Sequence, residues 1–132
     1  MAKNPVLNTY DLASVDALLQ KALELEQSDP EEALKLSKKA LKESKTHSFK
    51  AQEAHSYVRI GRCYWIKGNY KDAIHYLTQG LDVSAYIHDY LMKSEAHNAL
   101  GNVYIVMELM DQAIQHYNQA LTIAESKDYK EL

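Results

Sequence analysis

The chain has 132 residues, of which 46% are hydrophobic and 25% are charged, and these are the proportions of a folded domain rather than a disordered chain. Its net charge of −3 gives no electrostatic reason to expect a nucleic acid partner. Two prolines and four glycines leave few places for sharp turns, so we expect helices rather than many short strands.

The sequence also bears on the compartment of the protein. The segment from Met1 to Pro5 lacks the charged start and apolar run of a signal peptide, and no stretch of about 18 apolar residues is present to span a membrane. Cys63 is the only cysteine, so no internal disulfide and no thiolate zinc site can form. We therefore expect a cytoplasmic protein without a membrane partner.

The first part of the chain predicts two helices, over residues 11–27 and 30–45. Apolar residues recur at three- and four-residue steps from Leu12 to Leu25, as they do in an amphipathic helix. The second helix has a clear start, because Asp29 suits the N-cap and Pro30 suits the first helical position.

The middle of the chain predicts another pair, over residues 50–67 and 70–85. Tyr57, Ile60 and Tyr64 mark the stripe of the first helix of this pair. A break follows, where Gly68 suits a left-handed helix end and Asn69 suits an N-cap.

The last part predicts a third pair, over residues 90–107 and 110–126, because the sequence repeats itself at a step of 40 residues. The repeated columns include Ala33, Ala73 and Ala113, then Leu41, Leu81 and Leu121, and the pair Gly61 and Gly101. Small residues are expected where two helices cross closely, since larger ones would force the helices apart. Lys21 stands at the glycine position of the first unit, so we expect its helices to cross less closely.

These columns resemble the tetratricopeptide repeat, which has an aromatic residue, Leu-Gly, Tyr, and then two small residues around another aromatic. The second unit has Tyr57, Ile60, Gly61, Tyr64, Ala73, Leu77 and Gly80. The third has His97, Leu100, Gly101, Tyr104, Ala113, Tyr117 and Ala120, whereas the first keeps only Ala33, Ala40 and Leu41.

The resemblance implies an all-α, right-handed superhelix of three helix-turn-helix repeats, over about residues 11–49, 50–89 and 90–129, after an N-terminal extension at 1–10. The usual repeat has about 34 residues. The step of 40 residues is therefore similar to a longer subclass found in spindle-orientation adaptors and bacterial signalling proteins.

The resemblance also implies a binding site, because the first helix of each repeat lines a concave groove in this family. The groove positions are His55, Val58, Arg62, Trp65, Glu95, Asn98, Asn102 and Ile105, with Leu18, Ala22 and Leu25 in the first unit. Asparagine amides can hold a peptide backbone, Arg62 can hold a carboxylate and Trp65 offers apolar area. The alternative is that these are ordinary solvent-facing residues.

Motifs for catalysis are missing from the sequence. The four glycines are isolated, so no phosphate-binding loop is present, and the six histidines form no pair with the spacing of a zinc site. We therefore expect no catalytic residue, metal or cofactor, and a protein or peptide as the partner rather than a substrate.

A second hypothesis is an oligomerising or regulatory module that controls an attached signalling output domain. The last predicted helix keeps the apolar residues Ile114, Leu121 and Ile123, although the end of a repeat array usually has a polar outer face. The segment Lys127–Tyr129 resembles the earlier connectors, His47–Phe49 and His88–Tyr90. We therefore expect a fragment of a longer array, or a homodimer formed through the C-terminal repeat.

Overall fold

The computed structural model describes residues 11–126, which form six α-helices. The helices are α1 (Leu12–Leu25), α2 (Pro30–Thr46), α3 (Lys50–Ile66), α4 (Tyr70–Tyr86), α5 (Tyr90–Val106) and α6 (Met110–Ser126). Every end lies within two residues of the sequence prediction. The predicted N-terminal extension at 1–10 and the end of the predicted domain at 127–132 lie outside the described residues.

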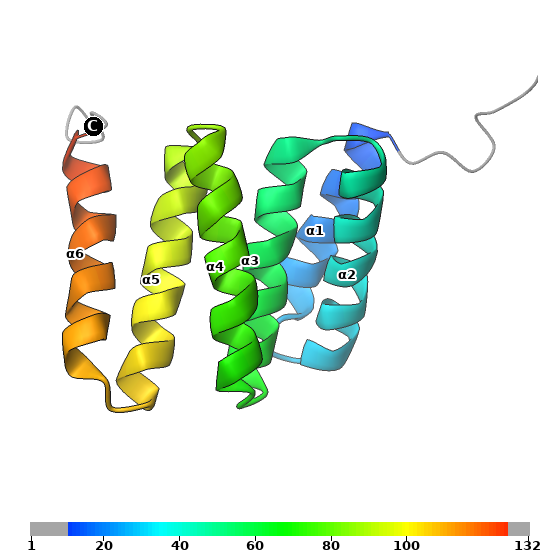
Figure 1. The fold of residues 1–132 in the computed structure, drawn as a ribbon. Helices are drawn as coiled ribbons and strands as arrows, with labels where there is room; N and C mark the ends of the chain where they lie inside the picture. The colour runs from blue at the N-terminus through cyan, green and yellow to red at the C-terminus, as the bar shows by residue number, and fades with distance from the viewer. Residues whose placement is uncertain (1–10, 127–132) are drawn as a thin grey trace, which may run out of the picture.

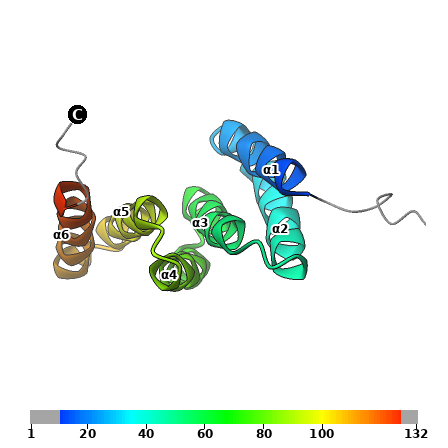
Figure 2. The same ribbon diagram turned by 90° about the horizontal axis from the view of Figure 1, so that it is seen from above.

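The helices form antiparallel pairs, α1 with α2, α3 with α4 and α5 with α6, which stand in a row (Figure 1). Each second helix also contacts the first helix of the next pair, as α2 does with α3 and α4 with α5. The row is curved, with α1, α3 and α5 on the inside and α2, α4 and α6 on the outside (Figure 2). This arrangement confirms the predicted all-α solenoid.

Small residues allow the two helices of a pair to pack closely. A Cβ atom on Gly61 would lie 2.5 Å from Cγ of Leu77, and one on Gly101 would lie 2.6 Å from Cε1 of Tyr117. Both distances are too short for real atoms, so any larger residue would push the Leu77 or Tyr117 side chain aside. The predicted crossings between α3 and α4 and between α5 and α6 are therefore confirmed.

The first pair departs from the prediction for Lys21. The Lys21 side chain is exposed, whereas Ala22 is buried in a cluster with Ala33 of α2 and Ile60 of α3. Ala22 lies eight residues before the start of α2 at Pro30, whereas Gly61 lies nine residues before the start of α4 at Tyr70. Relative to its second helix, the register of α1 is therefore shifted by one residue, and Ala22 is the small residue that it buries.

Four helices end in the same way, with one residue in the left-handed backbone region. The φ angles are 59° at Ser48, 84° at Gly68, 60° at His88 and 63° at Glu108. Around Gly68, as predicted, its own N–H donates to the carbonyl of Trp65 and the following N–H donates to that of Tyr64. These caps turn the chain sharply into the next helix.

The helix starts are less uniform. Asp29 caps α2, because its side chain accepts a hydrogen bond of 3.2 Å from the backbone N–H of Glu32, and Pro30 occupies the first turn. Both features were predicted. Asn69 does stand at the N-cap of α4, but its side chain makes no capping hydrogen bond. Within residues 11–126, no helix has the length and apolar character that crossing a bilayer demands.

Candidate functional site

The residues predicted to line the groove lie on α1, α3 and α5, and α3 contacts each of the other two helices on the inside of the curve. Asn98 and Ile105 are exposed, whereas His55, Arg62, Trp65, Glu95 and Asn102 are partly buried. Helices α3 and α5 therefore both carry side chains that solvent can reach.

Two of the predicted groove positions are wrong. Val58 is fully buried, and its Cγ2 atom would lie only 2.9 Å from a Cβ atom on Gly80, so it fills the crossing between α3 and α4. Ala22 is also buried, in the cluster between α1, α2 and α3. Neither side chain can contact a ligand without a rearrangement of the core.

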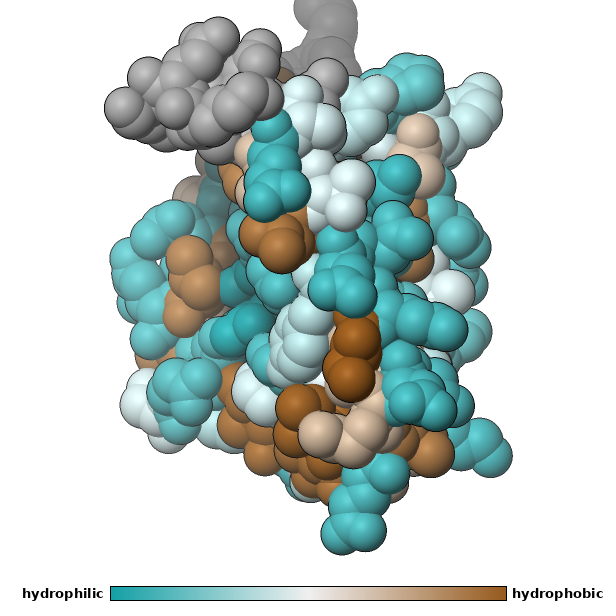
Figure 3. All heavy atoms as spheres, turned by 90° about the vertical axis from the view of Figure 1, so that its left-hand side faces the viewer, coloured by the Kyte–Doolittle hydropathy of each residue, from teal (hydrophilic) through white to brown (hydrophobic). Residues whose placement is uncertain are grey.

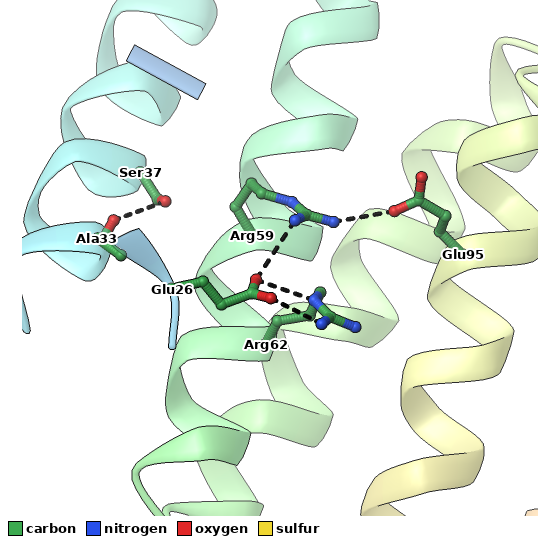
Figure 4. Close-up of polar contacts among 6 residues, drawn as sticks. All are labelled: Glu26, Ala33, Ser37, Arg59, Arg62 and Glu95. Atoms are coloured by element: carbon green, nitrogen blue, oxygen red, sulfur yellow. Dashed lines mark hydrogen bonds and ion pairs between the residues drawn. The ribbon is translucent and has the colours of Figure 1, made fainter. Parts of the chain in front are cut away.

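A network of charged side chains links the first helices of all three pairs (Figure 4). Glu26, at the end of α1, accepts hydrogen bonds from Nε and Nη2 of Arg62 at 2.9 and 2.7 Å, and from Nη1 of Arg59 at 3.3 Å. Nη2 of Arg59 donates in turn to Glu95 of α5 at 2.9 Å. Arg59 of α3 thus bridges the carboxylates of Glu26 and Glu95, and Arg62 holds Glu26 from the same helix.

The centre of this network is buried. The side chains of Glu26 and Arg59 are each only 5% exposed. Burial lowers the pKa of Arg59, although the nearby carboxylates act against this, whereas the hydrogen bonds that Arg62 donates to Glu26 raise the pKa of Arg62. The two positive charges of the arginines balance the two negative charges of the glutamates. Loss of one partner from a buried pair of this kind destabilises the fold strongly, because the other charge is left uncompensated.

The network changes the role expected of Arg62. Its fork is already engaged by Glu26, so a ligand carboxylate has to use the remaining N–H groups or displace Glu26. The guanidinium also lies over the ring of Trp65, with 5.9 Å between its carbon atom and the ring centroid. Arg62 and Trp65 therefore form one partly exposed, cationic and aromatic unit.

The polar residues on α5 are partly engaged as well. Oη of Tyr117 donates to Oδ1 of Asn102 at 2.5 Å, which leaves the amide N–H groups of Asn102 to act as donors. Glu95 is bound to Arg59, although its side chain is 42% exposed. Asn98 and Ile105, by contrast, are exposed and offer a polar and an apolar contact on the same helix.

The sequence prediction missed the histidine pair between α5 and α6. The Nδ1 atoms of His97 and His116 lie 2.9 Å apart, and the ring of Tyr104 stacks on that of His116. Burial is the main cause that lowers the pKa of His97 to about 4, and burial also lowers the pKa of His116. Both rings are therefore neutral near pH 7, and one donates to the other.

The remaining titratable groups offer little reactivity. Burial is the main cause that raises the pKa of Cys63 to about 11, so this sulfur is a thiol and a poor nucleophile. Burial lowers the pKa of His55. Among residues 11–126, no three His, Cys, Asp or Glu side chains are grouped closely enough to hold a metal ion.

Comparison with known proteins identifies the family of this arrangement. A family model described as tetratricopeptide repeat matches residues 12–85, and a second model with this description matches residues 94–127. The crystal structure of the TPR domain of Arabidopsis FLU superimposes with a TM-score of 0.75, covers 86% of this chain and 96% of that one, and is 20% identical in sequence. That identity shows a shared fold alone. A search of curated proteins finds no match.

Proposed function

Because the chain belongs to the tetratricopeptide repeat family, whose domains mediate contacts between proteins, we propose that it is a scaffold that binds a peptide or a helix of a partner protein in a groove along α1, α3 and α5. The observation that carries this proposal is the set of exposed and partly exposed side chains on α3 and α5. Trp65 and Ile105 supply apolar area, while Asn98 and Asn102 supply hydrogen bonds to a peptide backbone.

The repeat length supports a narrower assignment. The second helices begin at Pro30, Tyr70 and Met110, a step of 40 residues. We propose that the chain belongs to the long-repeat subclass seen in spindle-orientation adaptors and bacterial signalling proteins, with repeats at about 11–49, 50–89 and 90–129. The cytoplasm, expected from the sequence as a whole, is the proposed compartment.

The test of the groove compares a variant of the inner helices with a matched variant of an outer helix. Trp65→Ala, Asn98→Ala and Ile105→Ala are combined in one chain, and Thr78→Ala and Asp82→Ala, both on α4, serve as the control. Partners are captured from the source cell on the wild-type chain and identified, and their affinity for each purified variant is measured. The proposal requires that the groove variant loses the partner while the control keeps it, with melting temperatures close to that of the wild type.

Arg62→Ala is left out of that test, because it removes the bidentate partner of the buried Glu26. Its effect on the fold would hide an effect on binding. A groove variant that keeps full affinity for every captured partner contradicts the proposal.

A second candidate is an oligomerising module that forms a homodimer through the C-terminal repeat and controls an attached signalling output domain. It is favoured by the exposed apolar side chains of α6, among them Ile114 and Leu121. Light scattering over a wide concentration range tests it, since a mass of one chain at every concentration contradicts a homodimer.

A further inference from the structure

The outer side of α6 carries an apolar row that no other described helix covers. The row consists of Met110, Ile114 and Leu121, which are 55%, 51% and 55% exposed. Met107 and Leu109, in the connector before α6, extend it at one end. Figure 3 shows this side of the molecule, with apolar spheres gathered toward its lower end and polar spheres beside them.

The earlier repeats show what such a row packs against. Leu34 stands at the position of Ile114 on α2, but it is only 8% exposed because it lies in a cluster with Ile60 and Cys63 of α3. Ile74 and Leu81 stand at the positions of Ile114 and Leu121 on α4. They are partly buried against the cluster that includes residues of α5. In both cases a first helix covers the row of the preceding second helix.

The interface between α4 and α5 gives the chemistry of the covering helix. The buried residues that α5 contributes to its cluster with α3 and α4 are Met92, Ala96, Ala99, Leu100 and Val103. They form an apolar stripe with small residues at its middle, which lets the two helix backbones approach closely. The row on α6 is apolar at the same positions as that on α4, so a helix with a similar stripe fits it.

The charge of α6 distinguishes between the possible occupants. Between Met110 and Ser126 the sequence has Asp111 and Glu125 but no lysine or arginine, and Glu108 precedes the helix. Packing α6 against its own copy brings together two helices with only acidic charges, which repel. A partner helix with basic residues beside its apolar stripe avoids this repulsion.

We propose that the row of Met110, Ile114 and Leu121 is a docking site for one amphipathic helix of a partner protein, with alanine-sized residues at the middle of its apolar stripe and lysine or arginine beside it. This surface is separate from the groove of the inner helices. The inference does not depend on the groove being a binding site.

The test uses a fluorescent peptide with the sequence of residues 89–107, which contains α5, as the probe. A second peptide carries Glu95→Lys to add a basic charge. Fluorescence anisotropy then measures binding to the full chain, to the variant Ile114→Gln, Leu121→Gln, and to the control Leu12→Gln, Leu23→Gln. The control residues lie on α1 and are 46% and 45% exposed, so the two variants remove similar apolar surface.

We expect both peptides to bind the wild-type chain, and the α6 variant to weaken binding about tenfold or more because two half-exposed side chains lose their buried contacts. The control should bind as the wild type does. The peptide with Glu95→Lys should bind more tightly at low salt, and its advantage should shrink as salt is added.

Three results overturn the proposal. The first is no saturable binding of either peptide, and the second is an equal loss of binding in the two variants. The third is a dimer in light scattering that Ile114→Gln, Leu121→Gln dissociates, since the occupant is then a second copy of the chain. A different mode of binding is replacement of the chain's own α5 by the peptide. This exchange would not depend on Ile114 or Leu121, so the α6 variant distinguishes it from docking on α6.

Discussion

Glu26→Gln should destabilise the fold by about 3 kcal/mol, because breaking a buried ion pair leaves its partner charges uncompensated and costs roughly 3–5 kcal/mol. The glutamine keeps the shape of the side chain and one acceptor oxygen, but two guanidinium groups lose their shared negative charge. The lower part of the range applies because Arg59 keeps Glu95 and because Arg62 can still reach solvent.

The assay is urea unfolding followed by far-UV circular dichroism, with thermal unfolding as a second measurement. A loss of about 3 kcal/mol corresponds to a decrease in melting temperature of roughly 10 °C for a domain of this size. The matched control is Glu31→Gln, since Glu31 also forms an ion pair, with Lys67 at the C-cap of α3, but its side chain is 73% exposed. Exposed pairs contribute at most about 1 kcal/mol.

Equal stability of the Glu26 and Glu31 variants would refute the reasoning, because burial would then not determine how much an ion pair contributes to the free energy of unfolding. A double-variant cycle adds a sharper criterion. Arg62→Gln should cost less in the Glu26→Gln background than in the wild type, since the bidentate contact is already lost there. Additive losses would show that the two residues do not stabilise each other.

Three further predictions concern other parts of the fold. Gly101→Leu should destabilise by about 1–3 kcal/mol or more, because its side chain collides with the ring of Tyr117, as urea unfolding would show. Glu108→Gly should raise stability by up to about 1 kcal/mol, since glycine adopts the φ of 63° without strain. Stability should fall by up to about 3 kcal/mol as the pH drops from 6.5 to about 4, because the unfolded chain binds a proton at His97 before the folded chain does.

Each of these predictions has a control of the same kind. Lys35→Leu, at an exposed position of α2, should leave stability nearly unchanged where Gly101→Leu does not. Gly68→Ala should destabilise the equivalent turn, which is the opposite sign to Glu108→Gly. His97→Phe should flatten the pH dependence, whereas His75→Phe, at an exposed position, should not. For each variant, a change in the free energy of unfolding opposite to the one stated contradicts the reasoning behind it.

The helices were predictable because the same pattern of apolar and small residues recurs along the sequence. The repeated columns and the start and end signals at Pro30 and Gly68 are local, so they act whatever the rest of the chain does. The register of α1 was not predictable from the period, because Ala22 lies one residue closer to its second helix than Gly61 does and so takes the position expected of Lys21.

The candidate site was predicted less well, since its contacts join distant parts of the chain. Glu26 binds two arginines that lie 33 and 36 positions further along the sequence, and the spacing of residues within one helix does not predict such a contact. The pair of His97 and His116 likewise joins two helices. Val58 was assigned to the groove by resemblance, but the tight crossing beside Gly80 requires a buried side chain there.

The two proposed surfaces depend on the fold in different ways. The groove residues Arg62 and Glu95 belong to the network that links α1, α3 and α5, so a ligand bound there depends on the relative positions of all three repeats. The row on α6 depends on one contact only, because α6 packs against α5 and against no other described helix. Since each unit of a repeat array is stabilised by its neighbours, a helix docked on α6 would act first on the pair of α5 and α6. A ligand in the groove would instead fix the relative positions of all three repeats. The two partners would therefore compete only if docking on α6 changed the position of α5.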